Sequence, residues 1–315
     1  MNIIFYSNDS SAKDVVTGLR EALPEFTVTD FQETESDENV FEPQLAEYAV
    51  VWNPPANFFD GMTSLRGIFS LAAGVDHLLR HPALPKDVPL ARLENAGMGD
   101  KIAEYVLYGV LHYQRSMDFY RVQQGAGQWA TDKLDRHAGD IHVGILGTGA
   151  IGRVVADRLV DNNYSVSGWS RQHKEIPNVK MFSGRDSLNA FVEAVDVLVC
   201  LLPLTDSTEG IIDSKLLSRL GSNGYLINAA RGKHVNTDVL LQALQTGTIR
   251  GALLDVTEPE PLPSDHPLWE APNVLITPHV AGPTQTGESI RQTADNIRRA
   301  SRGEALSGLV GPEGY

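Results

Sequence analysis

Cysteine, long apolar runs and positive charge are all scarce in this sequence, and each shortage excludes a class of protein. The single cysteine, Cys200, cannot form an intrachain disulfide, and its apolar neighbours predict that it is buried. No apolar run reaches the roughly 20 residues of a membrane-spanning helix, and no basic region precedes an apolar signal core at the N-terminus. With 26 Lys and Arg against 40 Asp and Glu, the net charge of −14 disfavours nucleic acid and anionic lipid as partners. We therefore expect a cytoplasmic protein that binds neither nucleic acid nor membrane.

The residues that are present are typical of a globular α/β protein. The 315 residues are enough for two domains, with 42% apolar and 21% charged residues. Strand-like and helix-like segments alternate over residues 1–97 and again from residue 141, and a helical pattern runs between them from Ile102 to about Gln124. This rhythm predicts two domains, each with a parallel sheet covered by helices. The expected strands are residues 2–7, 27–31, 48–52, 67–71 and 88–93, then 141–146, 166–169, 195–202, 225–228, 249–254 and 274–276.

A glycine-rich turn follows the first expected strand of the second domain. It lies between a short apolar run and a segment with apolar residues at helical spacing. Gly147 permits a tight exit from the strand, Gly149 lets the backbone approach a pyrophosphate, and Gly152 lets the helix pack closely. The amides and the positive end of that helix then face the phosphates. A plain turn is the alternative, but the pattern favours a dinucleotide site made of Gly147, Thr148, Gly149, Ala150, Ile151 and Gly152.

Three chemically versatile side chains lie just after expected strands. They are Arg231 in the segment NAARG, Glu260 in DVTEPEPL and His279 in TPHVAG. In a doubly wound sheet the working residues lie beyond the carboxyl ends of the strands. Each residue alone also fits a non-catalytic role: Arg231 as a surface ion-pair partner, Glu260 as a loop residue and His279 as a solvated histidine. The three together, in this order at strand ends, favour a catalytic site.

The set suits the reduction of a 2-keto acid without a metal. An imidazolium can deliver a proton to the oxygen on which charge builds as a hydride arrives from a nicotinamide. A neighbouring glutamate favours the charged form of the imidazole, and a guanidinium offers a forked donor for a carboxylate and the adjacent carbonyl. We expect His279 to be the proton donor, Glu260 its partner and Arg231 the substrate anchor.

The motifs GTGAIG, LPLT, NAARG, LDVTEPEPL and TPHVAG, in this order, resemble those of the D-2-hydroxyacid dehydrogenase family, most closely its glyoxylate/hydroxypyruvate reductase branch. The resemblance spans nearly the whole chain. It implies a Rossmann-type, doubly wound dinucleotide-binding domain at residues 98–283, inserted into a smaller, flavodoxin-like substrate domain at residues 1–97 and 284–315. It also implies a homodimer, formed near residues 100–125, and it gives Arg231, Glu260 and His279 the roles expected above.

The same resemblance implies further site residues. The backbone amides of Ala73 and Gly74 would bind the substrate carboxylate, and Asp255 would contact the nicotinamide carboxamide. Thr257 departs from the family pattern, because many relatives carry an aromatic residue there. The other cofactor-binding candidates, which would otherwise be read as packing at strand ends, are Leu202, Pro203, Thr208, Ala229 and Ala281.

The segment after the second expected strand of the nucleotide domain indicates the cofactor. Residues 167–174 contain no Asp or Glu that could hold the ribose 2′-hydroxyl of NAD. Ser170 and Arg171 instead offer a hydroxyl and a positive charge for a 2′-phosphate. This favours NADPH, with NADH as the second option, whereas a solvated basic loop is the structural alternative.

The combined expectation is NADPH-dependent reduction of small 2-keto acids, glyoxylate and hydroxypyruvate first, to D-2-hydroxy acids. Trp52 ends an expected strand of the first domain and could wall the substrate end, although burial in the core is the alternative. One rival is an NAD-dependent D-lactate dehydrogenase or another D-2-hydroxyacid dehydrogenase. The other is a non-catalytic, nucleotide-sensing protein, since some relatives with this fold act as co-repressors.

Overall fold

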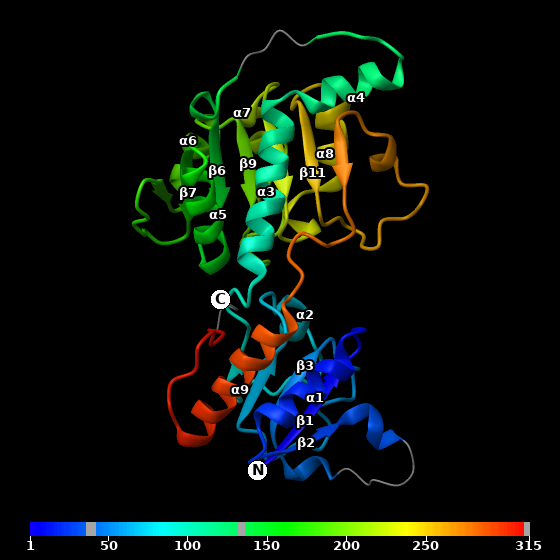
Figure 1. Cartoon of the computed structure of the whole chain (residues 1–315), viewed down its shortest axis with the longest axis vertical. Coiled ribbons are helices and arrows are strands. Elements are labelled where there is room, and N and C mark those ends of the chain that lie inside the picture. The colour runs from blue at the N-terminus through cyan, green and yellow to red at the C-terminus, as the bar shows by residue number, and fades with distance from the viewer. Residues whose placement is uncertain (36–41, 132–135, 312–315) are drawn as a thin grey trace. The chain divides into compact units, whose positions relative to one another are not determined.

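The chain divides into two compact units. The structure, a computed structural model, describes residues 1–35, 42–131 and 136–311. Unit 1 comprises Met1–Gly97 and Thr284–Tyr315, and unit 2 comprises Met98–Pro283. Unit 1 therefore holds both the blue and the red ends of the chain in Figure 1. Among the helices in the described ranges, none is both long and apolar enough to cross a membrane.

Unit 1 is built on a five-stranded parallel sheet in the order β2-β1-β3-β4-β5. This order is that of flavodoxin-like folds. Two helices follow strands β1 and β4, and a third belongs to the C-terminal segment. The strands are β1 (Asn2–Ser7), β2 (Thr27–Asp30), β3 (Ala46–Trp52), β4 (Gly67–Ser70) and β5 (Leu90–Ala91), and the helices are α1 (Ala12–Ala22), α2 (Asp76–Leu79) and α9 (Thr286–Arg302).

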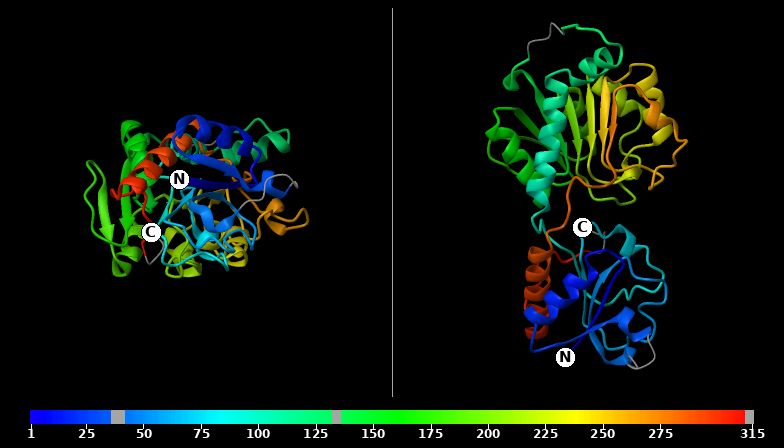
Figure 2. Two further views of the ribbon diagram at one scale, coloured as in Figure 1. Left: turned by 90° about the horizontal axis from the view of Figure 1, so that it is seen from below. Right: turned by 45° about the vertical axis from the view of Figure 1, so that its right-hand side comes forward.

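Strand residues of unit 1 alternate between two apolar layers, as the period of two in a strand requires. Ile3 and Phe5 pack in one cluster with Leu19 of α1 and Ile297 of α9, whereas Ile4 belongs to the cluster on the other face. Helices α1 and α9 lie side by side, as Figure 1 and the right-hand view of Figure 2 show. The C-terminal helix thus completes the core that the N-terminal segment begins.

Unit 2 is built on a seven-stranded parallel sheet in the order β12-β11-β10-β9-β6-β7-β8. Counted from β6, this is the Rossmann order with one added strand, so the predicted fold class is confirmed. The sequence did not predict β8, because its side chains are exposed or only half-buried and show no apolar run. The strands are β6 (His142–Leu146), β7 (Ser165–Ser170), β8 (Lys180–Ser183), β9 (Val197–Cys200), β10 (Tyr225–Asn228), β11 (Gly251–Leu254) and β12 (Val274–Ile276).

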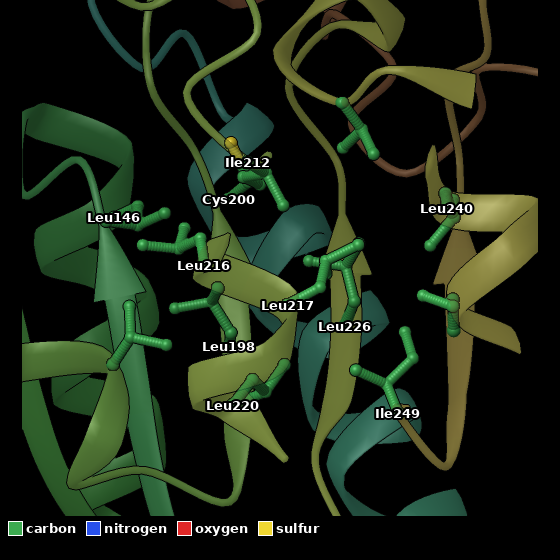
Figure 3. Close-up of a cluster of buried hydrophobic side chains, with 14 of the residues drawn as sticks. Leu146, Leu198, Cys200, Ile212, Leu216, Leu217, Leu220, Leu226, Leu240 and Ile249 are labelled. Atoms are coloured by element: carbon green, nitrogen blue, oxygen red, sulfur yellow. The ribbon is translucent and has the colours of Figure 1, made fainter. Parts of the chain in front are cut away.

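Helices cover both faces of this sheet. The side chains of Leu216, Leu226 and Leu240 meet in a cluster that also buries Cys200, as predicted (Figure 3). On the other face, a Cβ placed on Gly109 would lie 2.7 Å from the side chains of both Ile227 and Leu253, so one helix crosses strands β10 and β11 closely. The helices of unit 2 are α3 (Met98–Gln114), α4 (Met117–Gly125), α5 (Ala150–Asp161), α6 (Leu188–Glu193), α7 (Ser214–Leu220) and α8 (Thr237–Gln245).

The prediction of one helix from Ile102 to about Gln124 is wrong. The structure has two helices, α3 and α4, because Ser116 adopts a left-handed conformation with φ 51° and ψ 41°. The new helix is anchored at its start, where Asp118 accepts hydrogen bonds of 2.6 and 2.7 Å from Arg250 in a buried ion pair. Apolar spacing along α3 and α4 does not reveal this contact with a residue more than 130 positions away.

Candidate active site

The glycine-rich turn joins β6 to α5, and its shape requires two of its glycines. Gly147 has a φ of +98°, which side chains rarely tolerate, and a Cβ there would lie 2.7 Å from the carbonyl oxygen of Leu201. A Cβ on Gly152 would overlap the carbonyl oxygen of Gly147. The close approach at Gly152 is therefore to the turn itself, so the first turn of α5 folds back on the end of the strand.

The same turn leaves polar groups and space for a ligand. Around the position of a Cβ on Gly149, no described residue other than its two chain neighbours places a heavy atom within 4 Å. The hydroxyl of Thr148 is buried, and no hydrogen-bond partner is found for it among the described residues. The N-cap residue of α5 is Gly149, which has no side chain to cap the first amides of the helix, those of Ala150 and Ile151 among them. These features fit a dinucleotide phosphate, because helix N-terminal amides bind anions.

Ser170 and Arg171 lie at the same edge of the sheet as the glycine turn. Leu146 of β6 pairs with Trp169 of β7, so the ends of the two strands are adjacent. The Ser170 hydroxyl is buried and donates a hydrogen bond of 2.6 Å to the carbonyl oxygen of Gln172, and Arg171 is exposed. The serine oxygen keeps its capacity to accept, and the guanidinium is accessible to a 2′-phosphate.

The remaining cofactor candidates follow the neighbouring strands. Leu202 and Pro203 come directly after β9, and the hydroxyl of Thr208 donates a 2.7 Å hydrogen bond to the carbonyl oxygen of Pro203, which closes the turn. Ala229 follows β10, and its amide donates to the carbonyl oxygen of Cys200. The buried Ala281 follows β12. All of these positions follow the carboxyl ends of parallel strands, β9, β10 and β12, of the same sheet.

The three candidate catalytic side chains come from the loops after three adjacent strands. Arg231 follows β10, Glu260 follows β11 and His279 follows β12, and the pairing is parallel throughout. The Nδ1 atom of His279 lies 2.7 Å from Oε1 of Glu260, and both side chains remain accessible, with 47% and 40% of their surface exposed. The fold thus brings together residues that are 19 positions apart in the chain.

The electrostatics of this pair keep the carboxylate charged. The hydrogen bond from His279 lowers the pKa of Glu260 below its ordinary value and outweighs the opposing effect of burial, while the charge of Arg231 adds to the lowering. An ionised carboxylate accepts a hydrogen bond from the N–H group at Nδ1, which orients the imidazole and leaves Nε2 for chemistry. The Arg231 guanidinium is half-buried and donates to the carbonyl oxygen of Ala230 at 2.7 Å.

Asp255 is more enclosed than its expected role as a carboxamide contact suggests. Its carboxylate is 2% exposed and accepts three hydrogen bonds, from the Thr277 hydroxyl and from the amides of Val280 and Ala281, at 2.7 to 2.9 Å. The loop that carries His279 is therefore wrapped around this carboxylate. Thr277 was not singled out in the sequence, although it lies in the TPHVAG motif.

Thr257, where the chain departs from the expected motif, packs within its own loop. It is buried, and its hydroxyl donates to the carbonyl oxygen of Pro259 at 2.9 Å. A Cβ on Gly232 would overlap the backbone carbonyl of Thr257. The short side chain is thus part of a tight loop beside Arg231. Within the described ranges, no group of three or more His, Cys, Asp and Glu side chains could hold a metal ion.

The substrate candidates of unit 1 also follow adjacent strands. Trp52 ends β3 half-buried, with its ring 4.8 Å from that of His77 in an edge-to-face contact. Ala73 and Gly74 follow β4, and neither of their amides donates a hydrogen bond to another described residue. The carbonyl of Ala73 accepts from Nη1 of Arg92 at 3.5 Å. A turn with two such amides and a cation behind it suits a carboxylate.

Comparisons with known proteins agree with this geometry. Residues 107–281 match the model of the D-isomer specific 2-hydroxyacid dehydrogenase, NAD binding domain, family. A D-isomer specific 2-hydroxyacid dehydrogenase of Xanthobacter autotrophicus Py2, solved in complex with NADPH and MES, is 36% identical, with 99% of this chain and 98% of that chain covered and a TM-score of 0.92.

Two further solved structures are similar over almost their whole length. The NADPH-dependent glyoxylate/hydroxypyruvate reductase of Sinorhizobium meliloti, in complex with NADP and sulfate, is 33% identical, with 100% and 99% coverage and a TM-score of 0.91. A probable 2-hydroxyacid dehydrogenase of Rhizobium etli CFN 42, in complex with NADP, HEPES and L(+)-tartaric acid, is 32% identical, with 98% and 97% coverage and a TM-score of 0.88. The chain therefore belongs to the D-isomer specific 2-hydroxyacid dehydrogenase family.

Proposed function

We propose that this protein is an NADPH-dependent reductase of small 2-keto acids, with glyoxylate and hydroxypyruvate as its substrates and D-2-hydroxy acids as its products. The observation that supports this most directly is the hydrogen-bonded pair of His279 and Glu260 at the sheet edge that also carries Arg231. The similar protein of Sinorhizobium meliloti, a glyoxylate/hydroxypyruvate reductase, agrees with the proposed substrates.

His279 and Arg231 divide the work on the substrate. NADPH, when bound, supplies the hydride that adds to the keto carbon. The guanidinium of Arg231 binds the substrate carboxylate and the adjacent carbonyl oxygen through its forked donors. The imidazolium of His279 donates the proton from Nε2 to that oxygen, so the carbonyl becomes a hydroxyl and the histidine is left neutral.

Glu260 serves the same step through His279. Because its carboxylate stays ionised, it accepts the hydrogen bond from Nδ1 of His279 and fixes which nitrogen faces it. A proton donor that is oriented before the substrate binds needs no reorganisation during the reaction.

We assign the cofactor phosphates to the glycine turn and the 2′-phosphate to Ser170 and Arg171. The buried hydroxyl of Thr148, the open space at Gly149 and the uncapped amides of α5 support the first assignment. The accessible guanidinium and the absence of an acidic residue in 167–174 support the second. The residues proposed to line the site around the adenosine and the nicotinamide of the cofactor are Leu202, Pro203, Thr208, Ala229, Asp255 and Ala281.

In unit 1 we assign the carboxylate-binding amides to Ala73 and Gly74 and a size-limiting role to Trp52. These roles are supported by the amides of Ala73 and Gly74, which donate no hydrogen bond to another described residue, and by the half-buried indole of Trp52.

A homodimer also belongs to this proposal. Five large apolar side chains are exposed in the short stretch from α3 to the loop after α4, which suits an interface: Tyr108, Leu111, Met117, Val122 and Trp129. The cytoplasmic location expected from the sequence stays part of the same proposal.

The test is oxidation of NADPH and of NADH, measured in parallel, with glyoxylate, hydroxypyruvate, pyruvate and phenylpyruvate as acceptors. Rapid NADPH-dependent turnover of the two small acids is the expected result. Turnover with NADH and pyruvate alone would instead favour the D-lactate dehydrogenase alternative. NADPH binding without turnover of any acid would favour a nucleotide-sensing protein.

A further inference from the structure

A tyrosine hydroxyl on α3 reaches the loop that carries His279. The hydroxyl of Tyr105 lies 2.7 Å from Oγ1 of Thr277, a residue 172 positions further along the chain. The apolar spacing of α3 indicates that Tyr105 is a core residue, but its hydroxyl also forms a specific hydrogen bond with Thr277. That partner belongs to the same loop as the candidate proton donor.

The directions of the hydrogen bonds follow from the chemistry of the three groups. The Thr277 hydroxyl donates to Oδ1 of Asp255 at 2.7 Å, which leaves the Thr277 oxygen to accept. Burial raises the pKa of Tyr105, so its hydroxyl keeps its proton and donates to the Thr277 oxygen. The result is a directed chain from Tyr105 through Thr277 to Asp255.

Asp255 in turn holds the backbone on both sides of the histidine. Its main-chain oxygen accepts from the His279 amide at 2.8 Å. Its carboxylate accepts from the amides of Val280 and Ala281 at 2.8 and 2.9 Å. His279 itself has a φ of +57°, in the left-handed region that L side chains avoid, so this backbone needs such support.

Helix α3 supports the loop at a second point, one turn before the tyrosine. A Cβ on Gly282 would lie 2.7 Å from the side chain of Ile102, so the helix packs directly against the end of the loop. Residues three positions apart lie on the same face of a helix. Ile102 and Tyr105 therefore present one apolar and one polar contact to the segment that carries His279.

We propose that Tyr105 is a positioning residue for His279, acting through Thr277 and Asp255. The catalytic consequence rests on the proposed function, in which His279 is the proton donor. The structural consequence does not, since the hydrogen-bond chain fixes the loop whatever the imidazole does. Tyr105 itself does not touch the reacting atoms.

The test compares Tyr105→Phe and Thr277→Val with two controls in the full-length protein. Thr277→Ser keeps the hydroxyl and should rescue the loss seen in Thr277→Val. Tyr164→Phe is the matched control, because the Tyr164 hydroxyl is also shielded and donates a single hydrogen bond of 2.6 Å, to Gln114, away from the loop. The measurements are amide hydrogen exchange at Val280 and Ala281, the affinity for NADPH, and kcat and KM with glyoxylate.

We expect exchange at Val280 and Ala281 to become about three- to tenfold faster in Tyr105→Phe and Thr277→Val, as the loss of one hydrogen bond implies. The value of kcat should fall by a similar factor, whereas the affinity for NADPH should stay within about twofold because the glycine turn is untouched. Tyr164→Phe and Thr277→Ser should match the wild type in exchange at these two amides and in kcat.

Two outcomes would overturn the positioning role. One is exchange at Val280 and Ala281 that is unchanged in Tyr105→Phe. The other is an equal increase in Tyr164→Phe, which would indicate general loosening. If the wild type reduced no 2-keto acid while exchange responded as expected, the proposed function would fail and the positioning role would stand.

Discussion

His279 occupies a backbone conformation that residues with a side chain seldom adopt. Its φ of +57° costs about 1–2 kcal/mol relative to an ordinary backbone. Such conformations persist where the surroundings hold them, and here Asp255 binds the amides of Val280 and Ala281. The loop bears this conformational cost and, in doing so, places the imidazole beside Glu260. This is why we treat Asp255 as support for the histidine as well as a cofactor candidate.

The cofactor preference can be tested at a single residue. Arg171→Ala should weaken NADPH binding by about tenfold or more and leave NADH binding nearly unchanged, because a hydrogen bond to a charged group contributes about 1.5–3 kcal/mol. Titration of cofactor fluorescence measures both affinities. Lys215→Ala removes an exposed positive charge from α7 and serves as the control. An equal loss for both cofactors in Arg171→Ala would contradict the assignment.

At the scale of elements, the β-to-α turn and the strand ends were predictable because their signals are local. Glycine spacing and apolar runs identify β6, α5 and the strands that carry Arg231 and His279. The half-buried strand β8 lacks such a signal, and the break at Ser116 depends on tertiary contacts. The hydroxyl of Tyr105 and the three donors around Asp255 are equally invisible, because they join distant segments.

The glycine turn allows stability and cofactor binding to be separated. Gly152→Ala should destabilise the protein by about 1–3 kcal/mol, because the new methyl group overlaps the carbonyl oxygen of Gly147. Gly149 has an ordinary φ of −73° and open space around it, so Gly149→Ala should keep the thermal midpoint and weaken NADPH binding. Thermal melts and fluorescence titration give the two quantities. A stable Gly152→Ala protein would show that the turn can shift to accept a side chain.

The start of α4 should respond to pH through Asp118. Burial opposes ionisation of this carboxyl, but the hydrogen bonds and charge of Arg250 outweigh it and lower the pKa of Asp118 below its ordinary value of 3.8. A lowered carboxyl pKa stabilises the fold above the unfolded value, and this contribution is lost as the pH falls through the folded value.

Asp118→Asn should therefore cost about 3 kcal/mol at neutral pH, and its difference from the wild type should shrink in acid. Chemical denaturation at pH 7 and at stepwise lower pH measures this. Asp295→Asn is the control, because the exposed pair of Asp295 and Arg291 should contribute little. If the difference in unfolding free energy between the wild type and Asp118→Asn stayed constant with pH, that would contradict a stabilising role for the ionised Asp118 carboxylate.

At the scale of the whole molecule, the two units share one chain but hold separate cores. Helix α9 returns to the sheet of unit 1 after the chain has formed unit 2. The candidates Trp52, Ala73 and Gly74 therefore belong to unit 1, whereas Arg231, Glu260 and His279 belong to unit 2. The assignment of unit 1 to the substrate and of unit 2 to the cofactor is part of the proposed function.

The proposed homodimer gives a prediction at this scale. Val122→Glu places a charge among the exposed apolar side chains of α3 and α4, where Val122 is 58% exposed. Light scattering should give twice the chain mass of 34.4 kDa for the wild type and a shift toward one chain mass for the variant. Leu309→Glu, at a residue of equal exposure in unit 1, should leave the mass unchanged. A monomeric wild type would exclude the interface.

The most direct test of the proposed chemistry is glyoxylate-dependent oxidation of NADPH by the wild type and by His279→Ala, with NADPH affinity measured on the same samples. Removal of a general acid typically costs about 10²- to 10⁴-fold in rate. We expect turnover in the variant to fall by at least about a hundredfold while NADPH affinity stays within about twofold. Turnover by His279→Ala close to that of the wild type would contradict the assignment of His279 as the proton donor.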